Sequence, residues 1–440
     1  MTLPALPAPG VHGGGAEWGV AAVFAVVYAG MFLGGLPHVK LDRTGVAVLG
    51  AIAMIALTGM PVEEAARSVD LPTLVLLFAF MVVSAQMRLG GFYAEVTRVV
   101  AALPLARSAL LAALIAVAAA LSAVFSNDVV CLAMTPVVAR LALERRLDPV
   151  PLLVGLACAA NIGSALTLIG NPQNMLIGSL LALPFGGYVR AAWPPVLLSL
   201  ALLWLWLVFG PAGRAAVVPG RAPAPRVVPT TSATAPGNDA SPPYDAVQAT
   251  KGLLAAGALM AVFLFTGVPR DQAALVGAGV LLLSRRLHSA QVMGYVDWPL
   301  LLLFIGLFVV NHAFQGTGLA AQAVAWLAQQ GVHVREPGAL LVLGAALSNM
   351  VSNVPAVMLL LPHLGAAGTP GSEATGTLLA LASTFAGNLL LVGSIANLIV
   401  VDLAEKAGVR IDWAAHARIG APVTLASLAV TWGWLAGAGR

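Results

Sequence analysis

The chain has 440 residues, of which 60% are hydrophobic and only 9% are charged; its net charge is +4 and its mean hydropathy is +0.93. Because soluble domains carry roughly 25% charged residues, this composition excludes an ordinary soluble protein and predicts a polytopic membrane protein. The small positive charge does not indicate nucleic acid as a partner, since the basic residues lie in short segments between apolar runs.

Apolar runs long enough to enter or cross a bilayer follow one another along the chain. We expect them at 18–36, 43–60, 71–88, 107–125, 129–143, 150–169, 194–210, 251–267, 272–284, 298–314, 338–350, 354–365, 376–392, 394–404 and 419–437. Segments 90–103 and 316–330 have the pattern of helices at the membrane surface. Residues 1–17 contain no Lys or Arg, so the first run is expected to be a retained span rather than a cleaved signal peptide.

The middle of the chain, residues 211–250, is rich in Pro, Ala, Ser, Thr and Gly. This composition cannot bury enough apolar surface to fold, so we expect a disordered linker on the cytoplasmic side. The linker divides the chain into a first repeat, residues 1–210, and a second repeat, residues 251–440.

The two halves share a pattern. Asp-Leu-Pro at 70–72 recurs as Asp-Trp-Pro at 297–299, 227 positions later. With a one-residue gap the polar breaks align too: Ser126-Asn127 with Ser352-Asn353, and Asn161 with Asn388. Paired halves with interrupted helices at matching positions indicate the binding site of a transporter.

Basic residues give the expected topology. With the N-terminus outside, and five spans plus one re-entrant hairpin in each half, 17 of the 22 Lys and Arg, including Arg43, face the cytoplasm and 5 face out. This asymmetry agrees with the positive-inside rule. The predicted fold is therefore an all-α polytopic membrane protein of two inverted repeats. Each has about five spans, a re-entrant helical hairpin and a discontinuous helix, and both chain termini lie outside.

Polar residues gather where the hairpin tips and broken helices are expected. Such residues are costly in hydrocarbon and indicate function. Helix N-termini attract anions, and Asn and Ser oxygens suit Na⁺, for which Asn127 and Asn353 are candidate ligands. The candidate substrate and ion site consists of Ser126, Asn127, Asp128, Asn161, Ser164, Thr167, Asn171, Asn174, Ser352, Asn353, Thr384, Asn388, Ser394 and Asn397.

The members of this set do not indicate a binding site equally strongly. Ser and Thr in membrane helices can serve close packing alone, so the Asn residues are the stronger signal. Asp128 is the only carboxylate expected near a hairpin tip, and Val354 is its counterpart in the second half. It could carry a proton, bind Na⁺ or repel anions, and the alternative is a partly hydrated helix cap.

The apolar runs contain no cluster of His and acidic residues and no nucleophile beside a base, so we expect neither an enzyme nor a cofactor. Cys131 and Cys158 lie in apolar stretches and are interpreted as packing residues.

The paired Ser-Asn tips and the segment from Asn161 through Thr167 to 170–174 resemble the ion transporter superfamily. It includes divalent-anion/sodium symporters, citrate transporters, arsenite permeases and one group of sodium/proton antiporters. The resemblance covers nearly the whole chain outside the linker. It implies a homodimer with a scaffold domain and a transport domain that moves like an elevator. The dicarboxylate symporters have Ser-Asn-Thr at both tips, whereas Asp128 and Val354 stand here. Asn127-Asp128 followed by Thr135-Pro136 is similar to the arsenite permeases.

We therefore expect a secondary active transporter of a small inorganic or carboxylate anion in the cytoplasmic (inner) membrane, coupled to Na⁺ or H⁺. The alternatives are an arsenite/antimonite efflux permease and a Na⁺/H⁺ antiporter. A passive channel is less favoured, because paired breaks are typical of alternating access.

Overall fold

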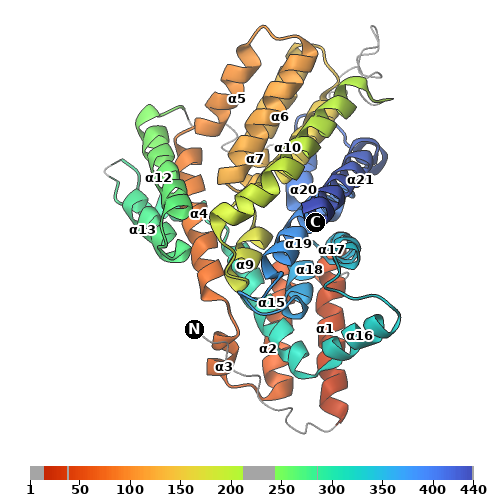
Figure 1. Cartoon of the computed structure of the whole chain (residues 1–440). Coiled ribbons are helices and arrows are strands. Elements are labelled where there is room, and N and C mark those ends of the chain that lie inside the picture. Colours follow the sequence, from red (N-terminus) through yellow and green to blue (C-terminus); the bar gives the residue numbers. More distant parts are fainter. Residues whose placement is uncertain (1–13, 37–38, 212–242, 285, 439–440) are drawn as a thin grey trace.

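The structure is a computed structural model that describes residues 14–36, 39–211, 243–284 and 286–438 (Figure 1). Its first half contains α1 (Gly14–Leu33), α2 (Arg43–Thr58), α3 (Val62–Arg67), α4 (Leu71–Leu89), α5 (Phe92–Ala102), α6 (Arg107–Val124), α7 (Asn127–Glu144), α8 (Pro149–Ser164), α9 (Pro172–Leu180) and α10 (Phe185–Phe209). Its second half contains α12 (Ala246–Phe265), α13 (Arg270–Leu282), α14 (Ser289–Met293), α15 (Trp298–Gly316), α16 (Leu319–Gln329), α17 (Pro337–Val351), α18 (Asn353–Leu360), η1 (Leu361–His363), α19 (Ser372–Ala386), η2 (Leu391–Gly393), α20 (Ile395–Lys406) and α21 (Trp413–Ala438).

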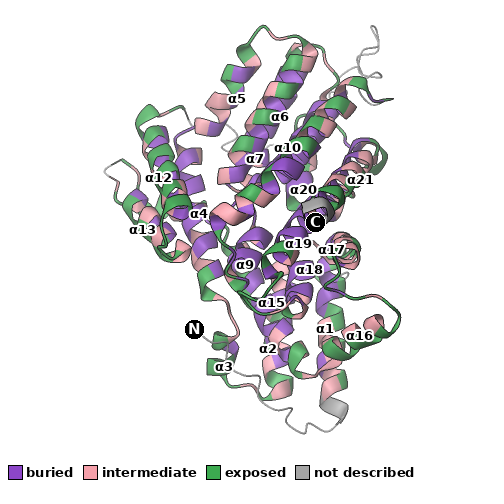
Figure 2. Ribbon diagram, in the orientation of Figure 1, coloured by how far each residue is buried: buried purple, intermediate pink, exposed green. Residues whose placement is uncertain are grey.

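The predicted all-α membrane architecture is confirmed. Among the described residues, α4, α6, α10, α12 and α15 are each long and apolar enough to cross a bilayer. Large apolar side chains also remain exposed, such as Phe265 at 82% and Trp18 at 72%. Exposed positions occur along α10, α12 and α13 (Figure 2). An apolar outer surface of this kind is stable against lipid tails and costly in water.

The Asp-X-Pro motif that recurs 227 positions apart is a helix start in both places. The Asp70 carboxylate accepts a hydrogen bond from Thr73 N at 3.1 Å, and the Asp297 carboxylate accepts one from Leu300 N at 3.0 Å. In each case the proline lies in the first turn, where its missing N–H costs nothing. The repeat in sequence is thus a repeat in local structure.

Two features differ from the expectation. Most of the predicted linker, residues 212–242, lies outside the described residues, and its last five residues, 246–250, already belong to α12 because Asp245 caps that helix. A two-stranded antiparallel ladder, β1 (Gly35–Leu36) with β2 (Leu41–Asp42), joins α1 to α2. The ladder needs a glycine, since a Cβ on Gly35 would lie 2.3 Å from Leu41 O.

Helices of the two halves pack against each other in a matched way. α2 packs against α15, and α13 packs against α4; α1 and α12 lie beside these pairs. This first group touches a second group, formed by α6 to α10 and α17 to α21, where α4 meets α9 and where α15 meets α18. Within the second group, α6 packs on α8, α17 packs on α19, and α10 packs on α21 (Figure 1).

Candidate functional site

Each half contains a pair of helices separated by a short polar break. α6 ends at Val124 and α7 begins at Asn127, whereas α17 and α18 are separated by Ser352 alone. The two breaks are built differently: Ser126 has an ordinary φ of −58°, but Ser352 has a φ of +75° with ψ 161°. That region is almost restricted to glycine, so the second tip is strained at a residue that was predicted to be functional.

The break between α8 and α9 packs against the first tip. The Thr167 hydroxyl donates to the backbone carbonyl of Ala123, at the end of α6. Asn171 caps α9, because its Oδ1 accepts a hydrogen bond from Asn174 N at 2.9 Å. A capped helix therefore begins beside the tip and directs its unpaired N–H groups toward it.

The break between α19 and α20 is organised in the same way. Ser394 Oγ accepts a hydrogen bond from Ala396 N at 3.2 Å and so caps α20. The Nδ2 group of Asn397 donates to two carbonyls of the unwound segment, Gly387 O at 2.8 Å and Leu390 O at 3.2 Å. The side chain of α20 thereby satisfies backbone that no helix satisfies.

Buried side chains join three of these four breaks. Asn127 Nδ2 donates to Asn161 Oδ1 at 2.8 Å. Asn161 Nδ2 donates to Asn388 Oδ1 at 2.8 Å and to Asn397 Oδ1 at 3.2 Å, and Ser394 Oγ donates to Asn161 Oδ1 at 3.0 Å. Asn161 thus receives hydrogen bonds from one tip and from the second half, and donates to the second half. The set is a single network across both halves.

The network has a direction. A backbone carbonyl can only accept, so the contacts of Asn397 to carbonyls fix which end of its amide faces Asn161. The orientation of the Asn397 amide determines the orientation of the Asn161 amide. That orientation in turn determines how the amides of Asn127 and Asn388 are turned. Two atoms then remain buried without a hydrogen-bond partner: the acceptor Asn127 Oδ1 and the donor Asn388 Nδ2. Unpaired buried polar atoms are rare, and a ligand is one reason for them.

A second polar cluster lies behind the first and also joins the two halves. Asn171 Nδ2 donates to Ser164 Oγ at 2.9 Å and to Thr384 Oγ1 at 3.3 Å. Thr384 Oγ1 in turn donates to Asn174 Oδ1 at 3.4 Å. Tyr188, which was not predicted, is hydrogen-bonded to Asn174 Nδ2 at 3.1 Å. All five side chains are buried, and their hydrogen bonds hold the α8–α9 break in place.

A small cavity of about 50 Å³ lies between the breaks. The N-terminal residues of four helices line it, two helices from each half: α7, α9, α18 and α20. Five of the predicted site residues form its wall: Asn127, Asp128, Ser352, Asn353 and Ser394. Val354, the counterpart of Asp128, lies on the same wall, so the asymmetry of the two tips is an asymmetry of this one cavity.

The other predicted residues are placed away from the wall. Asn161, Asn388 and Asn397 form the amide network, and Ser164, Asn171, Asn174 and Thr384 form the second cluster. Ser126 and Thr167 belong to neither set: Ser126 occupies the first break, and Thr167 ties the α8–α9 break to α6.

The sequence reasoning missed two polar residues that line the cavity. Gln173 lies inside the recognised segment 170–174, so its position was a usable signal; its Nε2 donates to Thr384 Oγ1 at 3.2 Å. Arg43 was expected to face the cytoplasm at the start of the apolar run 43–60; it is indeed the first residue of α2, but it lines the cavity. No local pattern indicated this, since the helix that brings it there packs on the other half of the chain.

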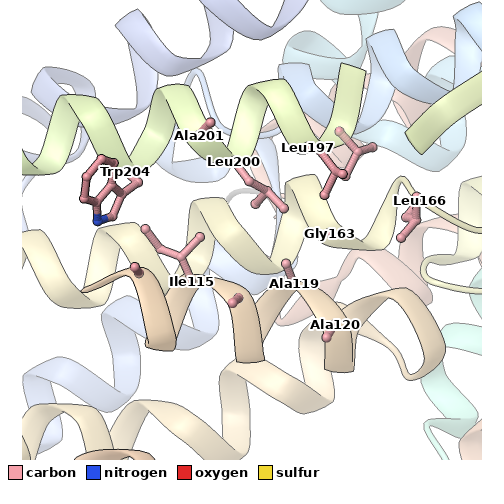
Figure 3. A pocket seen from close by; sticks show the side chains of 12 residues that line it. Ile115, Ala119, Ala120, Gly163, Leu166, Leu197, Leu200, Ala201 and Trp204 are labelled. Carbon is pink, nitrogen blue, oxygen red and sulfur yellow. The ribbon is translucent and has the colours of Figure 1, made fainter. Parts of the chain in front are cut away.

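A larger cavity, of about 360 Å³, lies between α6, α8 and α10 (Figure 3). Its lining is apolar, with side chains such as Ile115, Leu166 and Leu200, and it includes none of the predicted site residues. Its chemistry suits packing or lipid contact, not a polar solute.

Comparison with known proteins agrees with this architecture. The family model described as citrate transporter matches residues 31–386. The chain is 31% identical to the silicon efflux transporter LSI3 of Oryza sativa subsp. japonica, over 98% of each chain. It is also 31% identical to the inner membrane protein YbiR of Escherichia coli, over 79% of this chain and 83% of that one.

A solved structure, that of the Alcanivorax borkumensis YdaH transporter, shares the fold. It has a TM-score of 0.56 and 15% identity, and the match covers 96% of this chain and 98% of that one. Taken with a polar cavity between broken helices in an apolar, helical molecule, these matches assign the chain to the citrate transporter family and make it a multi-pass membrane transporter within the ion transporter superfamily.

Proposed function

We propose that the protein is a secondary active transporter that moves a small anion across the cytoplasmic membrane, coupled to Na⁺ or H⁺. The observation that carries this proposal is the convergence of four helix N-termini on one cavity. Each N-terminus has unpaired N–H groups equivalent to roughly half a positive elementary charge. Together they form a site that favours anions in a region where water is excluded.

The coupling ion would bind at the same cavity. Asn127 is only 6% exposed, and its Oδ1 lacks a hydrogen-bond partner among the described residues. The next residue, Asp128, adds a carboxylate to the same wall. An amide oxygen beside a carboxylate suits Na⁺, and the carboxylate alone suits a proton. Asn353 on the second tip is the other proposed Na⁺ ligand.

The packing supports two inverted repeats and an elevator mechanism. Exchanging the halves turns the contact of α2 with α15 into that of α13 with α4, and the contact of α8 with α20 into that of α19 with α9. We assign α1, α2, α4, α12, α13 and α15 to a scaffold that dimerises, and α6 to α10 with α17 to α21 to a moving transport domain. In this scheme both termini lie outside and residues 211–250 are cytoplasmic.

The site assignment is tested with purified protein in proteoliposomes. Uptake of sulfate, a dicarboxylate and citrate is measured with and without a Na⁺ gradient and with and without a proton gradient. Asn127→Ala and Asn388→Ala are expected to abolish uptake without loss of expression. Gln86→Ala is the control, because Gln86 is a buried amide of α4 that bonds to Gln248 of α12, and neither residue lines the cavity. Full transport by both site variants would contradict the assignment.

A second function is favoured by one observation. The cavity wall combines a carboxylate, amide groups and hydroxyls, a mixture that also suits a neutral hydroxide, which both donates and accepts hydrogen bonds. A relative at 31% identity is named as a silicon efflux transporter. Arsenite or antimonite efflux and Na⁺/H⁺ exchange are therefore the alternatives. Growth of cells that express the protein, in arsenite and in high sodium, separates them: protection against arsenite favours the permease.

A further inference from the structure

Among the residues that the structure describes, Arg43 has the one cationic side chain on the cavity wall, and it comes from outside the polar breaks. Arg43 opens α2, whose start is held by two contacts. Asp42 caps the helix by accepting a hydrogen bond from Gly45 N at 2.8 Å. Thr44 Oγ1 donates to Pro299 O at 3.2 Å, which ties this turn to the start of α15. The backbone that carries the guanidinium is therefore fixed by the scaffold helices.

The guanidinium has no partner within the described part of the protein. No carboxylate there lies within the 4.0 Å of an ion pair with Arg43, and its Nε is buried without a hydrogen-bond acceptor. A buried donor that bears charge is costly when it is unpaired. An acceptor that is not part of the chain would remove this cost.

The matching residue of the second half shows what a satisfied arginine does in this position. Arg270 follows Arg43 by 227 positions, the offset of the repeated Asp-X-Pro motif, and it opens α13 as Arg43 opens α2. Its Nη2 donates to Gly178 O at 2.7 Å, near the end of α9. The chain thus supplies an acceptor to one arginine of the pair and leaves the other facing a cavity.

We infer that Arg43 is a substrate-binding residue that pairs with the anionic group of the transported solute, a carboxylate or a small oxyanion. This inference rests on the proposed function and narrows its substrate class. The planar guanidinium offers a fork of donors that matches such groups. The cavity of about 50 Å³ has room for a few non-hydrogen atoms, since one water needs about 10–15 Å³ by this measure.

The acidic residues around the cavity explain why a second ion would be needed. Asp128 is on the wall with Arg43, and Asp297, at the start of α15, is close enough to Asp128 for their charges to repel. A bound anion adds a further negative charge to this region. A cation or proton at Asp128 offsets it, so binding of the anion to Arg43 and of the cation to Asp128 favour each other.

The test measures binding to the purified full-length protein in detergent, with citrate and sulfate as anionic probes and with arsenite and silicic acid, which are neutral at pH 7. Arg43→Gln is expected to weaken binding of the anionic probe roughly ten- to hundredfold and to leave a neutral probe unchanged. Arg43→Lys keeps the charge without the fork, so intermediate affinity is expected. Arg190→Gln removes an exposed charge elsewhere and should have no effect.

Three outcomes overturn the inference. In the first, Arg43→Gln and Arg43→Lys both bind the anion as the unaltered protein does, while Asn127→Ala does not bind; the proposed site then survives without Arg43. In the second, Arg43→Gln weakens neutral and anionic probes equally, which is a structural role. In the third, the unaltered protein binds only neutral probes. Unchanged binding in Asn127→Ala and Asn388→Ala as well would overturn the proposed site itself. If Arg43→Gln does not fold, the comparison rests on Arg43→Lys.

Discussion

Among single residues, Asn161 has the largest share in the geometry of the site, although it does not line the cavity. It accepts hydrogen bonds from Asn127 and Ser394 and donates to Asn388 and Asn397. Because both ends of its amide are used, it passes the orientation that Asn397 sets on to Asn127 and Asn388. That direction leaves Asn127 with a free acceptor on the cavity wall.

Asn161→Asp tests this role with almost no change of volume. A carboxylate accepts only, so the variant loses both donated hydrogen bonds and places an oxygen against two oxygens. We expect a loss of roughly 1–3 kcal/mol of stability and loss of transport. Thermal unfolding in detergent and proteoliposome uptake measure the two effects. Thr135→Val is the control, because Thr135 is buried but bonds only within its own helix, to Cys131 O; equal effects in both variants would argue against the network.

Ser352 provides a second prediction at this scale. Its φ of +75° favours glycine, so Ser352→Gly should relieve backbone strain and raise stability by about 1 kcal/mol. Ser126 has a φ of −58°, and Ser126→Gly should instead lower stability by roughly 0.5–1 kcal/mol through backbone entropy. Unfolding midpoints of the two variants are therefore expected to move in opposite directions. A shift of both in the same direction would contradict the assignment of strain to one tip.

Among elements, the site depends on how closely α6 approaches α8. A Cβ on Gly163 would lie 2.3 Å from Ala119 Cα, so these helices cross where only glycine fits. The crossing is two residues beyond Asn161 and therefore sets where its amide lies. Small residues of this kind allow close helix packing in membranes, where no hydrophobic effect draws helices together.

Gly163→Ala should force α6 and α8 apart, cost roughly 1–3 kcal/mol of stability and reduce transport. Gly257 in α12 is the matched control, because its Cβ would meet no atom within 4 Å, and Gly257→Ala should be neutral or stabilising by roughly 0.5–1 kcal/mol. Thermal unfolding compares the two. Unchanged stability in Gly163→Ala would show that the crossing adapts without cost.

For the whole molecule, the two helical groups meet through contacts that any sliding movement must break. Ser179 Oγ donates to Asp70 at 2.9 Å, and Arg270 donates to Gly178 O at 2.7 Å. Both contacts hold the end of α9 against α4 and α13. Arg43, which matches Arg270 in the other half, lines the cavity instead. The conformation is thus asymmetric between two similar halves, as expected of one end state of alternating access.

Weakening the contact of Arg270 with the end of α9 should lower the population of this asymmetric conformation. A cysteine at Ser352 reports it, because Ser352 lines the cavity while Cys131 and Cys158 are fully buried and form an unreactive background. We expect Arg270→Gln to slow labelling of Ser352→Cys by a membrane-impermeant thiol reagent roughly fivefold, the effect of one lost hydrogen bond. Arg190→Gln, the control, should leave the rate unchanged. Equal rates in both would mean that Arg270 does not hold this state.

The sequence by itself determined the class of protein and most of its helices. Composition decides between water and lipid as solvent, and apolar runs with Asp and Pro at their starts define helix limits, because these signals act within a few residues. The Asn positions of the network were also predictable, since amides in apolar runs need partners. These local signals do not tell which segments that are remote in the chain lie close together in space.

Only the tertiary structure decided which of these residues face a common space. Asn161 lies 227 positions from Asn388, and Thr44 lies 255 positions from Pro299, the contact that brings Arg43 to the cavity. Such contacts arise when α2 packs on α15 and α8 packs near α20. The orientation of each amide likewise depends on carbonyls in another element. The cavity, the arginine on its wall and its unpaired acceptor are therefore products of packing between the two halves, which no local pattern encodes.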